Sequence, residues 1–126
     1  MSKKDKRFVI QEHRTGTEVH WDFMFESDCT LQTYRLDKTP EDILHSPANA
    51  VKIFDHSLKF LTYQGQVNKG RGNVCIVETG TYQILQEKHD LIKLNLNGQI
   101  LKGKSVLTHI KDDNWLLTYK PESSSS

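Results

Sequence analysis

The segment at residues 19–26 constrains the fold most strongly, because its large apolar and polar side chains alternate with a period of two. Side chains of a β-strand leave alternate faces of the sheet, so this alternation predicts a strand. The aromatic face is suited to a hydrophobic core. The mostly polar face is typical of either a solvated outer surface or a functional site. The first face carries Trp21, Phe23 and Phe25, and the second carries His20, Asp22, Met24 and Glu26.

Similar short segments recur along the chain and are separated by turn residues. Asn97-Gly98 is a strong hairpin signal, and Thr79-Gly80 is also expected to form a turn between two strands. Thr39 before Pro40 predicts a short helix, because threonine caps helices and proline suits the first helical position. Further strands are expected at residues 7–11, 30–35, 50–54, 74–78, 81–86, 91–96, 103–110 and 115–119, and a glycine-rich loop at 65–73.

This arrangement predicts a mainly β protein, a compact antiparallel β-barrel with one or two short flanking helices. A length of 126 residues fits one domain that buries its own core. We expect that domain to span residues 7–120, between a disordered arm at 1–6 and a disordered tail at 121–126. No feature of the sequence indicates an obligate oligomer, so a monomer is expected.

The composition argues against several classes of protein. A formal net charge of +1 does not support electrostatic binding of nucleic acid over a broad surface, so such binding would depend on a local patch of positive charge. No apolar run is long enough for a membrane span, and no apolar segment of a signal peptide follows the basic residues 1–7. Cys29 and Cys75 are expected to be buried, reduced thiols. These features predict a cytoplasmic protein.

Three candidate metal ligands, His13, His20 and Asp22, fall within ten positions. Two imidazoles and one carboxylate suit Mn²⁺, Zn²⁺ or Fe²⁺ at a site that keeps positions open for water and substrate. There are two alternatives to this metal site. One is a metal-free surface pair of histidine and aspartate. The other is a barrel oxygenase whose Fe(II) is held by His20, Asp22 and the distant His109, but it leaves Gln11 and His13 unexplained.

Two further polar segments are candidates for phosphate binding. His56 follows a predicted strand and would serve either as a turn residue or as a phosphate contact and general acid. The glycine-rich loop carries Lys69 and Arg71 and would offer backbone N–H groups to an anion, although such loops are more often long hairpin connections. His45 and His89 have no partner at ligand spacing and are interpreted as structural or surface residues.

Three motifs resemble the 3′-phosphoesterase domain of bacterial DNA ligase D, a family that also occurs as stand-alone proteins in bacteria and archaea. Residues 8–13 (Phe-Val-Ile-Gln-Glu-His) resemble the family pattern F-V-[IV]-Q-[KE]-H. Residues 20–23 (His-Trp-Asp-Phe) resemble H-[YW]-D-[FL], and residues 55–58 (Asp-His-Ser-Leu) resemble D-H-P-L. Weaker matches in the glycine-rich loop and the last hairpin extend the resemblance over about residues 7–120.

The resemblance implies an antiparallel β-barrel that trims nucleic-acid 3′ ends with manganese, removing terminal ribonucleosides and 3′-phosphates. His13, His20 and Asp22 would hold the metal, and Gln11 and His56 would contact the scissile phosphate and carry catalysis. Lys69 and Arg71 are further candidates for nucleic-acid contacts. A ligase or polymerase acting in trans is an expected partner.

The chain departs from the family pattern at three points. Met24 stands where the family has arginine, and Phe60 stands where it often has tyrosine. The gap between His13 and His20 is one residue longer than is typical, so a bulged loop is expected there. These departures favour an alternative function, in which a catalytically degenerate homologue binds metal, nucleic-acid ends or a repair partner.

Overall fold

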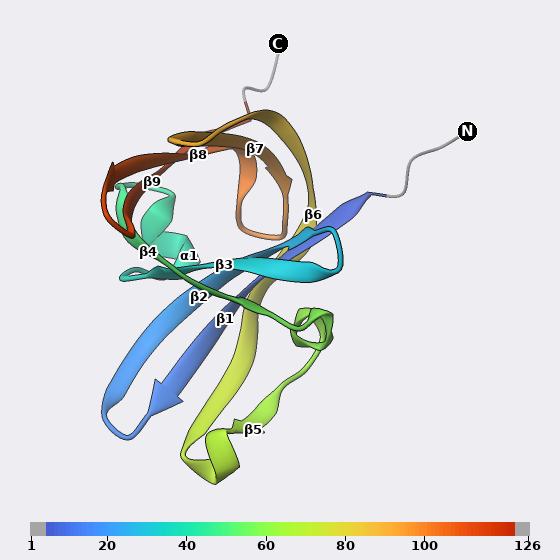
Figure 1. Ribbon diagram of the computed structural model, residues 1–126, viewed down its shortest axis with the longest axis vertical. Coiled ribbons are helices and arrows are strands. Elements are labelled where there is room, and N and C mark those ends of the chain that lie inside the picture. Colours follow the sequence, from blue (N-terminus) through green and yellow to red (C-terminus); the bar gives the residue numbers. More distant parts are fainter. Residues whose placement is uncertain (1–4, 123–126) are drawn as a thin grey trace.

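The computed structural model describes residues 5–122 as an antiparallel barrel of eight strands with a ninth strand, β5, attached to its side (Figure 1). The barrel closes because β1 pairs with β2 on one side and with β6 on the other. The mainly β class and the antiparallel barrel predicted from the sequence are confirmed. The strands are β1 (Lys6–Thr15), β2 (Glu18–Ser27), β3 (Thr30–Leu36), β4 (Ala48–His56), β5 (Gly65–Val67), β6 (Gly72–Lys88), β7 (Leu91–Asn97), β8 (Lys102–Lys111) and β9 (Asn114–Pro121).

Three short helices complete the fold: α1 (Pro40–Ile43), η1 (Leu58–Leu61) and η2 (Asn68–Gly70). The predicted start of α1 is confirmed, since the hydroxyl of Thr39 accepts a hydrogen bond from the backbone N–H of Asp42. Within residues 5–122, no helix has the length and apolar character needed to cross a membrane.

The predicted turn at Thr79-Gly80 is wrong, because β6 runs through it without interruption. The first part of β6 pairs with β1 and the last part with β7, and the two registers overlap at Thr81 and Tyr82. Gly80 is required there by a close approach of backbones, since a Cβ atom would lie 2.1 Å from the carbonyl oxygen of Asn97. The glycine therefore marks the place where one long strand changes partners.

Other predicted bounds also need correction. The expected loop at 65–73 contains β5 and η2. The expected terminal segments overlap the barrel at Lys6 and Pro121, while residues 1–4 and 123–126 lie outside the described residues. Neither cysteine is buried as expected, since Cys29 is exposed and Cys75 is partly exposed, and both are free thiols.

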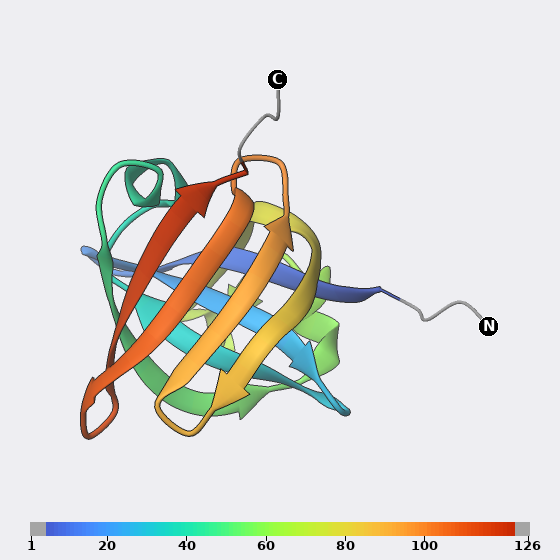
Figure 2. The same ribbon diagram turned by 90° about the horizontal axis from the view of Figure 1, so that it is seen from above.

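The sheet buries two separate apolar clusters, one on each face of β1, β2 and β3. The main core fills the barrel and includes Phe8, Phe23 and Tyr34. The second cluster lies on the outer face, where Val9, Met24, Leu31 and Leu61 pack under η1. Strands β6 to β9 cross the other strands on the opposite side of the barrel (Figure 2). The polar face of β2 is therefore partly covered by η1, instead of being fully solvated.

Candidate functional site

The hairpin of β1 and β2 brings the predicted metal ligands together. His13 lies directly opposite His20 in the antiparallel register, and Gln11 lies opposite Asp22. The register continues to Thr15 and Glu18, so the strands are joined by a tight two-residue turn. The bulged loop expected between the two histidines is therefore wrong. An even number of intervening residues lets the hairpin close symmetrically and leaves both imidazoles on one face.

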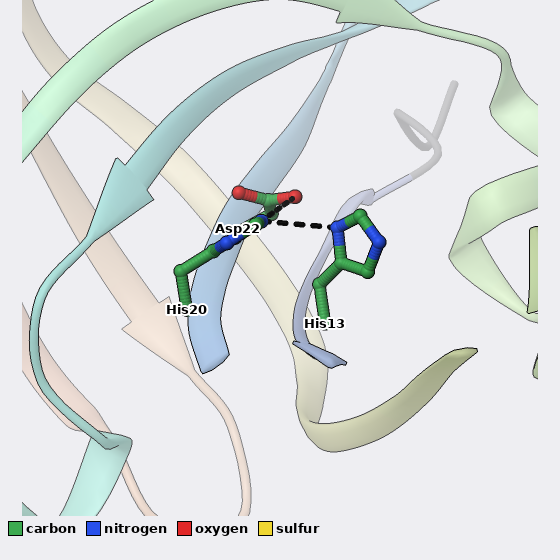
Figure 3. A group of neighbouring side chains, drawn as sticks. All are labelled: His13, His20 and Asp22. Atoms are coloured by element: carbon green, nitrogen blue, oxygen red, sulfur yellow. Dashed lines mark hydrogen bonds and ion pairs between the residues drawn. The ribbon is translucent and has the colours of Figure 1, made fainter. Parts of the chain in front are cut away.

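The three side chains converge on a common point (Figure 3). His13 Nδ1 lies 3.0 Å from His20 Nε2, and His20 Nε2 lies 3.7 Å from Asp22 Oδ2. One potential ligand atom from each residue fits within a group no wider than 4.8 Å. Donor atoms that share one ion at about 2.1 Å are separated by roughly 3.0–3.4 Å, so a small adjustment would accommodate a divalent metal.

Arg35 on β3 fixes the carboxylate of this cluster. Its Nε donates to Asp22 Oδ1 across 3.2 Å, which leaves Oδ2 facing His20. Asp22 is only 4% exposed, so it is shielded from water, whereas the guanidinium is partly open. A partner of this kind orients a ligating carboxylate and is part of many metal sites. The donor set and its supporting bond therefore fit a divalent cation.

A shallow hollow opens beside the cluster and would admit a small ligand. Its wall includes both histidines and the arginine from the sheet, together with a residue of η2 from the glycine-rich segment. The lining residues are His13, Thr15, Glu18, Val19, His20, Arg35 and Asn68.

A sequence model of the family described as the DNA ligase D 3′-phosphoesterase domain matches residues 11–109. The chain belongs to this family. The match spans the cluster of His13, His20 and Asp22, together with His56 and the glycine-rich segment. The family predicted from the resemblance of the three motifs is therefore confirmed.

Known relatives of this 3′-phosphoesterase family member are much longer proteins. The multifunctional non-homologous end joining DNA repair protein LigD of Mycobacterium tuberculosis is 32% identical over 117 residues, which cover 86% of this chain and 15% of the relative. The corresponding protein of Pseudomonas aeruginosa is 25% identical over 123 residues, covering 88% of this chain and 14% of the relative. The chain thus spans about one seventh of the curated relatives it matches.

In this phosphoesterase family member, His56 extends the polar face from β3 to β4. Its Nδ1 lies 2.7 Å from the hydroxyl of Thr33, which itself donates to the carbonyl oxygen of Leu31. The contact with Thr33 anchors one ring nitrogen of His56 on the sheet. Phe54 stacks on the ring and Phe60 meets it edge-on, which holds its orientation.

Gln11 has a tethering role in the structure. Its side chain is 2% exposed, and Nε2 donates to the carbonyl oxygens of Phe60 and Tyr63. Two carbonyl acceptors require the amide nitrogen at that position. Gln11 thereby fastens the η1 segment over the outer face of the sheet, and its predicted phosphate contact stays a prediction.

The remaining candidates fall on or beyond the edge of the site. Lys69 and Arg71 are exposed, and neither of them lines the hollow. Asn68 is the residue of η2 that does. His109 lies on the hairpin of β8 and β9, where Nε2 contacts the carbonyl oxygen of Asp112. Within residues 5–122, the ligand cluster holds His13 instead of His109, which argues against the oxygenase interpretation.

The departures from the family pattern have a structural explanation in one case. Met24 is 1% exposed and packs in the second apolar cluster, so it supplies hydrophobic contact where arginine would supply charge. Phe60 packs against the same cluster and offers no hydroxyl. The nearby hydroxyl of Tyr63 donates to the carbonyl oxygen of Gln66.

Sequence reasoning missed three residues that shape the site: Thr33, Arg35 and Gly72. The first two lie on β3 and face the site only because of the pairing of β3 with β2 and β4. The position of Arg35 opposite Asp22 in the register was the available signal, but it required the correct strand pairing. Gly72 lies behind His13, and nothing in its local sequence pointed to that contact.

We expect Gly72→Ala to weaken metal binding without unfolding the protein. The added Cβ would lie 2.8 Å from His13 Nε2 and 3.2 Å from Val67 Cγ2, so the imidazole must leave its present position beside His20. Disturbing the support of a ligand typically lowers metal affinity by about 10- to 100-fold. Isothermal titration with Mn²⁺ measures this, and Gly70→Ala, whose Cβ would lie 3.7 Å from Gln66 Oε1, tests general strain in the loop. Equal affinities for Gly72→Ala and wild type would contradict the prediction.

Burial lowers the pKa of both His20 and His56 from the ordinary value of 6.5, with the charge of Asp22 opposing the shift in each case. The arginine that binds Asp22 lowers both further, as does His13 for His20. The imidazoles therefore remain neutral to lower pH than in the unfolded chain. Neutral imidazole is the form that binds metal.

The stability of the metal-free protein should consequently rise with pH in the weakly acidic range. Between the lowered folded-state pKa and 6.5, the unfolded chain binds more protons, so the free energy of unfolding increases with pH. His56→Gln should flatten part of this slope, since it removes one of the two groups. Urea unfolding in EDTA at several values between about pH 5 and pH 7.5 tests the difference. An unchanged slope in His56→Gln would show that this imidazole does not contribute.

Proposed function

We propose that this protein is a metal-dependent phosphoesterase that processes the 3′ ends of nucleic acid, removing terminal phosphates or ribonucleotides. Membership of the 3′-phosphoesterase family supports a role in end processing. The relatives are named as non-homologous end joining proteins, which supports DNA ends as the substrate. Mn²⁺ is the metal we propose, with Zn²⁺ and Fe²⁺ as alternatives.

The observation that carries the proposal is the convergence of His13, His20 and Asp22 beside an open hollow. A structural metal site is usually closed by four protein ligands, whereas a catalytic one leaves a position for water or substrate. Here three side chains from two adjacent strands face one point, and the hollow gives access to it. This pattern is the one expected of a catalytic centre.

Each protein group has a role that follows from its position. His13 Nδ1 and His20 Nε2 lie 3.0 Å apart, and both would bind one metal with each imidazole carrying its proton on its other ring nitrogen. Arg35 leaves Asp22 Oδ2 free to act as the anionic ligand. A bound divalent ion would polarise a phosphoryl oxygen and lower the pKa of a coordinated water.

His56 would act at the leaving oxygen. Its Nε2 would donate a hydrogen bond to the phosphate when protonated, and would pass a proton to the departing oxygen. The hydrogen bond to Thr33 and the aromatic contacts hold the ring in one orientation. Gln11 would act with His56 by holding η1 in place, with its amide oxygen left for a polar contact.

The test is release of 3′-phosphate from a primer–template by purified protein with Mn²⁺, alongside His20→Ala. Activity that requires both the metal and His20 would support the proposal. His89→Ala is the matched control, because that histidine is exposed at the turn between β6 and β7. Folded wild-type protein that binds Mn²⁺ but releases no phosphate or ribonucleotide would overturn it.

A degenerate binding module is the second candidate function, and Met24 is the observation that favours it. Its side chain fills an apolar cluster beside the metal ligands, where a cation would contact a phosphate directly. Loss of a charged hydrogen bond of this kind costs about 1.5–3 kcal/mol. The same assay separates the two functions, because a binding module would hold metal and a 3′ end without turnover.

A further inference from the structure

Four aromatic rings form a continuous row from β4 across η1 to the segment after it, and one end of the row is open to solvent. Phe54 stacks on His56 with centroids 4.8 Å apart and an angle of 21° between the rings. His56 then meets Phe60 edge-on at 5.6 Å, and Phe60 meets Tyr63 at 5.8 Å. We call Phe54, His56, Phe60 and Tyr63 the aromatic row.

Phe54 is the most exposed large apolar side chain among the described residues, at 74%. A single exposed apolar residue is ordinary on a protein surface. Phe54 differs because one face of its ring is covered by His56, whereas the high exposure leaves the other face free. It therefore presents a flat, oriented aromatic surface to solvent.

The charges around the aromatic row favour an anionic ligand. Lys59 Nζ lies 5.3 Å from the ring centre of Phe60 and 5.9 Å from that of Tyr63. Asp55 is the nearby acidic side chain, and its carboxylate is engaged by the hydroxyl of Thr30 at 3.0 Å and by Lys52 Nζ at 3.8 Å. The row thus combines stacking surfaces with the positive charge of Lys59.

We propose that Phe54 is a stacking platform for an unpaired base at the 3′ end of the nucleic-acid substrate. Single-stranded nucleic acid is typically held by aromatic side chains that stack on bases and by cations that follow the backbone. A base on the open face of Phe54 would hold its own phosphate close to His56, and Lys59 would neutralise a neighbouring phosphate. This inference rests on the proposed function and specifies its substrate as an end with an unpaired terminal nucleotide.

Binding in EDTA tests the proposal independently of catalysis. Two fluorescein-labelled primer–templates are compared by fluorescence anisotropy: one ends in an unpaired 3′ thymidine, and the other ends in an abasic residue. We expect Phe54→Ala to weaken binding of the first probe by about 5- to 150-fold, the usual range for one stacked base. Binding of the abasic probe should be unaffected, because that probe has no base to stack.

Two further variants make the result specific. Phe54→Trp should retain binding of the thymidine probe, and its indole emission should be quenched by the stacked base. Ile110→Ala is the matched control, since Ile110 is 60% exposed on a different hairpin and should bind as wild type. Wild-type binding of both probes by Phe54→Ala would overturn the proposal, and so would an equal loss of both. Hydrolysis by wild type, measured in parallel with Mn²⁺, shows separately whether the proposed function holds.

Discussion

Asp22→Asn should abolish the proposed metal binding and phosphoesterase activity while leaving the fold intact. Asparagine has the same shape as aspartate, so its side-chain oxygen retains the hydrogen bond from Arg35 Nε. The amide then faces His20 Nε2 in place of the carboxylate oxygen that lies 3.7 Å away. The cluster loses its only anion, and an amide nitrogen is not a metal ligand.

The expected loss in Mn²⁺ affinity is at least about 100-fold, because removal of a ligand exceeds the 10- to 100-fold cost of disturbing its support. The rate of 3′-phosphate release should fall by at least about 100-fold, since a catalytic metal contributes several kcal/mol to transition-state stabilisation. Isothermal titration and the primer–template assay measure the two losses. Asp90→Asn, at the exposed turn after β6, is the matched control. Retained Mn²⁺ affinity in Asp22→Asn would remove Asp22 from the metal site.

Glu78→Gln should be strongly destabilising, although the residue lies outside the metal ligands. Glu78 is 2% exposed, and its carboxylate accepts four backbone hydrogen bonds of 2.7–2.9 Å. Three of these bonds hold the turn between β7 and β8, which includes Gly98. The four donors are the N–H groups of Thr79, Gln99, Ile100 and Leu101.

Glutamine would replace one oxygen with an amide group that cannot accept these bonds, and two buried N–H groups would be left without partners. Charged hydrogen bonds contribute about 1.5–3 kcal/mol each, and an unsatisfied buried donor costs about 1–3 kcal/mol. We therefore expect the free energy of unfolding to fall by about 3–5 kcal/mol, measured by urea denaturation. Glu87→Gln, exposed near the end of the same strand, should change it by less than about 0.5 kcal/mol. An equally small change in the free energy of unfolding of Glu78→Gln would show that water accepts the hydrogen bonds of the backbone N–H groups in this turn.

The barrel was predictable because its main signals are local. Alternation at residues 19–26, the Asn97-Gly98 turn and the cap at Thr39 each depend on side chains a few positions apart, and all three features are present. The turn predicted at Thr79-Gly80 was wrong because the conformation there depends on a residue distant in the sequence. Glycine permits both a tight turn and a close approach of two backbones, and only the position of Asn97 decides between them.

The sequence by itself determined the clustering of His13, His20 and Asp22, because they belong to one hairpin whose period and turn place them on one face. Tertiary structure alone decided what surrounds that cluster. Arg35 reaches Asp22 only through the pairing of β2 with β3, and the second apolar cluster arises only when η1 folds over the outer face. Strand alternation is a property of neighbouring residues, whereas register between distant strands depends on the packing of the whole barrel. For that reason the proximity of these three side chains could be predicted from sequence, and their supporting residues and the aromatic row could not.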